Sequence, residues 1–126
     1  MNIESVRTIF SLFSGETETE ALMPFVTLAM AEIEKMLAEN ADITDIRLEF
    51  LCAAQANYRY CQANAARDSS ENTYGGKLAK YSDKSGTLRC AELLLADYMN
   101  MCGDLIKPKT FMFMSFGSET EGIENA

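Results

Sequence analysis

Apolar residues recur every three or four positions in four stretches of the chain, the spacing that predicts amphipathic helices. The first stretch covers residues 3–13, with Asn2 placed to cap its start and Gly15 placed to end it. In the second stretch, Thr17 and Glu20 match a capping box. Pro24 fits the first turn of a helix, or else kinks one that begins at Thr17. The secure part of the second helix therefore follows Pro24.

The third predicted helix begins near Asp42 or Thr44 and runs to about Ala66. The fourth begins near Ser85 or Thr87 and ends by Gly103, with Pro108 just beyond. Between them, residues 67–85 are rich in Gly, Ser, Asp and Asn and show no helical period. The pattern there predicts a long loop or a short, weak hairpin.

Near the end of the sequence, residues 109–117 read KTFMFMSFG, and the apolar residues there do not follow the period of a helix. In an extended strand Phe111 and Phe113 point one way, and the apolar residues between and after them point the other way. A strand on the surface of a helical domain should turn one polar face to water. This segment has no polar face, so we expect its own chain or a second subunit to cover it.

The predicted fold class is therefore all-α: a bundle of about four helices with a minor β element. The β element comprises a loop or hairpin over 72–82 and a C-terminal strand over 110–116. The length of 126 residues predicts one domain, over 1–117, followed by an acidic tail over 118–126 that we expect to be disordered.

Composition narrows the classes of function. The net charge is −8, which argues against tight binding to phosphate backbones or to anionic membranes. The N-terminus lacks the basic and apolar regions of a signal peptide, and every apolar run is too short to span a bilayer. We therefore expect the protein to lie in the cytosol.

Candidate chemistry is sparse. Histidine is absent, which removes the commonest general base and a common metal ligand. The four cysteines form no CxxC pair, and we interpret them as reduced, small apolar residues. Glu16, Glu18 and Glu20 precede a helix, and Glu32 and Glu39 lie on it; a Mg²⁺ or acid–base pair is one reading, and a solvated acidic face that complements the helix dipole is the favoured one. We predict no enzyme activity, no catalytic or metal-binding residues and no cofactor.

Two further clusters have competing interpretations. Lysines at 77, 80 and 84 and Arg89 lie near Tyr74 and Tyr81 in the sequence. These residues could bind nucleic acid, with the tyrosines stacking on bases, or the basic residues could pair with the acidic bundle of a neighbouring subunit. In the third helix, Tyr58 is expected to point inward, with Arg59 and Tyr60 outward.

The order of elements resembles the small head–tail connector, or adaptor, proteins of long-tailed phages and prophages. The likeness rests on FLCAAQANYRYCQA, then TYGGKLAKYSDKSG, then AELLLADYMNMC and finally FMFMSFG, and it spans about residues 25–117. It implies a structural protein that forms an oligomeric ring beneath the portal, in the host cytoplasm and then in the virion neck. The implied partners are other copies of the chain and portal or tail proteins, with DNA only as passing cargo and no membrane.

Carried over by position, the resemblance makes 72–82 a loop that reaches a neighbour, and 111–116 a contact strand. The interface residues it implies are Tyr74, Lys77, Lys80, Tyr81, Phe111, Met112, Phe113, Met114 and Phe116. Two other functions remain open. The chain could be a monomeric helical interaction or regulatory protein whose strand pairs internally with 73–81, or a carboxylate-based, metal-dependent enzyme.

Overall fold

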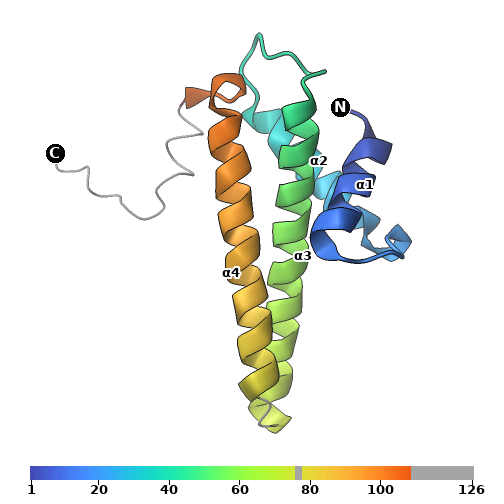
Figure 1. The fold of residues 1–126 in the computed structure, drawn as a ribbon, viewed down its shortest axis with the longest axis vertical. Helices are drawn as coiled ribbons and strands as arrows, with labels where there is room; N and C mark the ends of the chain where they lie inside the picture. The colour runs from blue at the N-terminus through green and yellow to red at the C-terminus, as the bar shows by residue number, and fades with distance from the viewer. Residues whose placement is uncertain (76–77, 109–126) are drawn as a thin grey trace, which may run out of the picture.

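The computed structural model describes residues 1–75 and 78–108, with side chains described for 1–67 and 86–108. The elements, in order, are α1 (Ile3–Ser14), η1 (Glu20–Leu22), α2 (Met23–Met36), α3 (Ile46–Gly75), α4 (Leu78–Met101) and η2 (Gly103–Leu105). Figure 1 shows α3 and α4 as a long antiparallel hairpin, with α1 and α2 packed beside the half of α3 nearer its start. The predicted all-α, four-helix architecture is confirmed.

Both predicted ends of α1 are confirmed. The side chain of Asn2 accepts hydrogen bonds from the backbone N–H groups of Glu4 and Ser5, at 2.8 and 3.3 Å. At the other end Gly15 has a φ of 78°, and its N–H donates to the Ser11 carbonyl at 2.9 Å. That left-handed conformation is strained for residues with a side chain, which explains why glycine ends the helix.

The helix α2 begins at Met23, so Pro24 lies in its first turn and does not kink it. The predicted capping box is wrong, because Thr17 precedes the helix by six residues and the single turn η1 lies between them. Val26, Ala29, Ile33 and Met36, which recur every three or four residues along α2, are buried.

The predicted loop or hairpin over 67–85 is the main error in the fold. The helix α3 continues to Gly75 and α4 starts at Leu78, so residues 72–75 and 78–82 are helical and contain no β hairpin. Each Gly, Ser or Asp in a helix costs at most about 1 kcal/mol relative to alanine. Packing of two long helices along their length outweighs such local costs.

The core lies between α3 and the other three helices. Its largest fully buried side chains are Phe10, Ile33, Leu48, Leu51 and Ile106, together with Val6, Val26, Cys52 and Cys102. None of the four cysteines, all of them in the described part of the chain, forms a disulfide; three are buried and Cys90 is exposed. Burial raises the pKa of Cys52 to about 12 and that of Cys102 to about 11, so both stay protonated thiols at neutral pH. The reading of the cysteines as small apolar residues fits the three buried ones.

Residues 105–107 lie against the end of α2. Leu37 and Ile106 form an isolated antiparallel bridge, in which the Ala38 N–H donates to the Leu105 carbonyl and the Lys107 N–H to the Met36 carbonyl, both at 2.9 Å. The predicted strand over 110–116 and the predicted tail over 118–126 lie outside the described residues. Within the described part of the chain, no helix has the length and apolar content that crossing a bilayer requires.

Candidate functional site

The residues predicted for an interface fall into two groups. Tyr74 lies in the last turn of α3, and Lys80 and Tyr81 lie in the first turn of α4, so the fold brings these three to the tip of the helical hairpin. Lys77 and the five residues Phe111, Met112, Phe113, Met114 and Phe116 lie outside the described residues. The predicted reaching element at 72–82 is thus the end of two helices rather than a loop.

Charge is distributed unevenly along the molecule. Residues 1–66 contain ten acidic and four basic residues, whereas residues 67–90 contain three acidic and five basic ones. The first segment forms α1, α2 and the paired half of α3, and the second forms the projecting part of the hairpin (Figure 1). The bundle end of the molecule is therefore acidic and the hairpin tip weakly basic, which suits contact between opposite ends of two copies.

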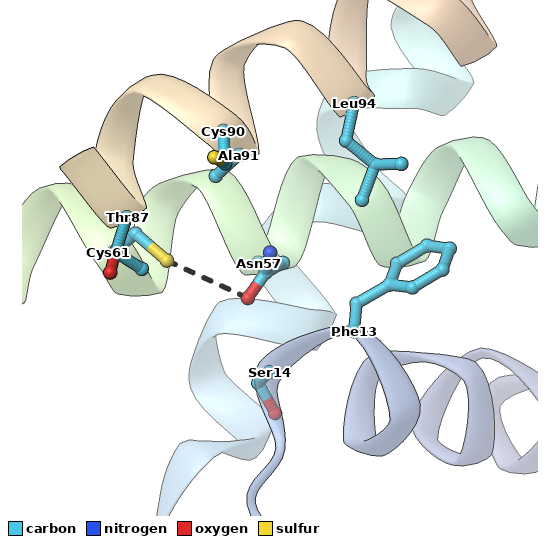
Figure 2. Close-up of a pocket in the computed structure, with 8 residues that line it drawn as sticks. All are labelled: Phe13, Ser14, Asn57, Cys61, Thr87, Cys90, Ala91 and Leu94. Atoms are coloured by element: carbon cyan, nitrogen blue, oxygen red, sulfur yellow. Dashed lines mark hydrogen bonds between the residues drawn. The ribbon is translucent and has the colours of Figure 1, made fainter.

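A pocket of about 270 Å³ opens where the end of α1 meets the hairpin (Figure 2). Two of its walls are apolar, formed by Phe13 of α1 and by Ala91 and Leu94 of α4. The remaining lining residues are Ser14, Asn57, Cys61, Thr87 and Cys90. Sequence reasoning did not single out this pocket, because its residues are distant in the chain and are brought together by the crossing of α1 over α3 and α4.

Asn57 supplies a polar group to this pocket. Asn57 is only 5% exposed, and its Oδ1 accepts a long hydrogen bond from the Cys61 thiol at 3.7 Å. Figure 2 shows this bond and the amide lying between Phe13 and Cys61. Within the described part of the chain, no hydrogen bond is seen for the Asn57 side-chain nitrogen.

The prediction that Tyr60 points outward is wrong, because its ring is packed between α1 and α2. Its ring lies edge-on to Phe10 and Phe25, with centroids 6.0 and 5.8 Å away, and its hydroxyl donates to Glu16 at 2.6 Å. Partial burial, reinforced by the bond to Glu16, raises the pKa of Tyr60. The sequence did contain the signal, since Tyr60 follows Asn57 by three residues and Ala53 by seven, and so continues the buried stripe of α3.

A second polar network joins α2 to α3. Glu32 accepts hydrogen bonds from Arg59 and Gln55, both at 2.7 Å. Partial burial would raise the pKa of Glu32, but the bonds from Arg59 and Gln55 outweigh that effect and lower it. Because Arg59 already neutralises Glu32, this carboxylate stabilises the contact between α2 and α3 and is not free to act as a metal ligand or base. The Gln55 Oε1 is the one buried side-chain acceptor left without a partner among the described residues.

This network predicts a pH dependence. A lowered pKa in the folded state means that Glu32 contributes stability above its unfolded pKa near 4.5, and that the contribution is lost as the pH falls through the lower folded value. We expect urea unfolding to show a steeper loss of stability below about pH 5 in the native chain than in Glu32→Gln. Glu34→Gln, at an exposed position on the same helix, is the control and should follow the native curve. Parallel curves for Glu32→Gln and the native chain would contradict this role.

Arg47 joins the two ends of the hairpin. It donates to Asp45 at 2.8 Å, to Asp104 at 3.0 Å and to the Met101 carbonyl at 2.9 Å, linking the start of α3 to the end of α4. Its bonds hold the pKa values of Asp45 and Asp104 below their ordinary range. This arrangement fixes helix ends and offers no open position for a ligand.

Metal-ligating side chains do not gather in the described part of the chain: no group of three or more Cys, Asp or Glu residues is placed to hold an ion there. Comparison of the chain with protein-family models, with curated proteins and with solved structures found no match.

Proposed function

We propose that the protein is a non-enzymatic structural connector of a phage or prophage, which assembles into an oligomeric ring between portal and tail. The single observation that best supports assembly is the separation of charge along a projecting hairpin, with the acidic bundle at one end and the basic segment 67–90 at the other. Contacts between unlike ends of successive copies are heterologous, and such contacts form a ring where the rotation from one copy to the next closes.

Exposed apolar side chains give further support. Leu12 of α1 is 76% exposed and Leu93 of α4 is 56% exposed. Single exposed leucines are ordinary in monomers, but the C-terminal sequence KTFMFMSFG adds five large apolar residues that also need cover. A second subunit can supply that cover. DNA would pass through such a ring as cargo, past a surface whose net acidity disfavours sticking.

The structure changes two of the alternatives. Internal pairing of the C-terminal strand with a strand at 73–81 is wrong, because residues 73–75 and 78–81 are helical. A monomeric interaction protein would therefore need a different cover for its C-terminal segment. In a carboxylate-based enzyme Glu32 would be the natural ligand, yet it is held by Arg59 and Gln55. Both observations favour the connector.

Deletion of residues 110–117 tests the proposal. We expect light scattering after size exclusion to show concentration-dependent oligomers for the full chain and monomers for the deletion. The matched control deletes residues 119–126, which removes a similar length of chain but none of the Phe and Met residues, and it should assemble normally. A full chain that stays monomeric at high concentration, alone and with portal protein, would exclude the proposed function.

A further inference from the structure

Two cysteines on opposite helices of the hairpin, Cys61 of α3 and Cys90 of α4, line the same pocket (Figure 2). Cys90 is exposed, so it can meet a small oxidant in solution. Cys61 is only 6% exposed and is sheltered beside it. An accessible thiol next to a sheltered second thiol is the arrangement of redox-sensitive pairs, in which the first thiol reacts and the second resolves the product.

The register of the hairpin places the two cysteines within one turn of each other. The rings of Phe50 and Tyr98 stack across the hairpin, with their centroids 5.7 Å apart. In an antiparallel pair each step along α3 is matched by a step back along α4, so eleven residues after Phe50 the chain at Cys61 lies level with Thr87. Cys90 follows Thr87 by three residues, an offset of about 4.5 Å along the helix axis.

The directions of the side chains reduce this offset. Side chains of a helix lean toward its N-terminus, and α3 and α4 run in opposite directions (Figure 1). Cys61 therefore leans toward the level of Cys90, and Cys90 leans toward the level of Cys61. The sulfur of Cys61 follows this direction, because it donates to Oδ1 of Asn57, four residues earlier in α3, at 3.7 Å. Axes of packed helices lie about 8–10 Å apart, so Cα atoms near their line of contact approach to about the 4.4–6.8 Å that a disulfide spans.

We propose that Cys61 and Cys90 form a reversible disulfide when the chain meets a small-molecule disulfide. The Cys90 thiolate attacks one sulfur of the oxidant, which breaks the S–S bond of the oxidant, forms a mixed disulfide and releases one small thiolate. The Cys61 thiol then gives its proton to solvent and attacks the Cys90 sulfur, which releases the second small thiolate. The chain loses two electrons and two protons, and the oxidant is reduced to two thiols. The proposal concerns a single chain and does not rest on the proposed function.

The other two cysteines do not compete with this pair. Cys52 and Cys102 are fully buried, and burial raises the pKa of Cys52 to about 12 and that of Cys102 to about 11. The thiolate is the form that attacks a disulfide, so neither residue reacts at neutral pH while the chain is folded. Oxidation is therefore confined to the two thiols of the pocket.

The intact mass of the native full chain, incubated with oxidised glutathione at neutral pH, tests the proposal. We expect each chain to lose about 2 Da, to keep two of its four thiols under denaturing conditions, and to yield one cross-linked peptide pair that contains residues 61 and 90. Dithiothreitol should restore the original mass. A stable adduct of one glutathione per chain would overturn the proposal, because it would show that Cys61 does not reach the mixed disulfide. An unmodified chain, or a disulfide that joins two chains through Cys90, would overturn it as well.

Three variants separate the roles of the two thiols. Cys61→Ser should stop at the mixed disulfide and keep one glutathione on Cys90, whereas Cys90→Ser should stay unmodified. Glu92→Cys combined with Cys90→Ser moves the exposed thiol about 200° around the axis of α4, away from the pocket, so it should hold glutathione without closing a disulfide. Closure in this variant as fast as in the native chain would show that the bond does not depend on the pocket, contrary to the proposal. Circular dichroism checks that each variant is folded, and the result on the native chain stands without them.

Discussion

Replacing Phe10 by alanine is expected to lower the free energy of unfolding by about 3–5 kcal/mol, the usual cost of deleting a buried aromatic ring. Phe10 is 0% exposed, and its ring meets that of Tyr60 edge-on at 6.0 Å. It is the largest fully buried side chain by which α1 packs on α3. The loss therefore combines the transfer of the ring, the empty space it leaves and the lost aromatic pair.

Urea unfolding at neutral pH measures this effect, with Leu12→Ala as its control in the same helix. Leu12 is 76% exposed, so its substitution should change stability by no more than about 0.5 kcal/mol. Equal losses for the two variants would show that α1 does not pack on the core through the Phe10 face.

Replacing Ile106 by alanine is expected to cost about 2–5 kcal/mol. Ile106 is 2% exposed and lies after the last turn of the described chain, where it bridges to Leu37. Its side chain closes the core at the end of α2, and the flanking bonds to Met36 and Ala38 hold the backbone there. Removal leaves a cavity, because the helices around it cannot collapse without breaking those bonds.

Lys107→Ala is the matched control for Ile106→Ala. It keeps the backbone bond to the Met36 carbonyl and removes only an exposed side chain, so its unfolding curve should overlay that of the native chain. A small effect of Ile106→Ala, comparable to that of Lys107→Ala, would mean that residues 105–107 add little to the core.

Sequence periodicity predicted the helices and most of their buried faces, because burial of an apolar stripe is a local signal. Asn2 and Gly15 mark α1 correctly, since caps depend on residues within one turn. The sequence did not predict that α3 continues from Ala66 to Gly75, because the interactions that stabilise this part are not local. The Gly and Ser residues after Ala66 weaken a helix locally, while the partner that stabilises it is α4, which lies beyond the turn.

The candidate site was less accessible from sequence than the fold. Tyr74, Lys80 and Tyr81 lie near the hairpin tip because α3 ends and α4 begins there, whereas the sequence predicts a loop. The pocket needed the crossing of α1 over the hairpin, which no periodicity encodes. Among the residues that line the pocket, Asn57 alone gave a signal in the sequence, because it is a polar residue on an otherwise apolar stripe of α3.

The connection between α3 and α4 also bears on how the chain folds. Their contact is the most extensive in the molecule, and only residues 76–77 separate the two helices in sequence. Such a contact closes with little loss of chain entropy, so the hairpin is the natural place for folding to nucleate. The docking of α1 joins segments that are tens of residues apart and would follow later. Substitutions in α1 should therefore act mainly on the rate of unfolding, and substitutions along the paired faces of α3 and α4 on the rate of folding.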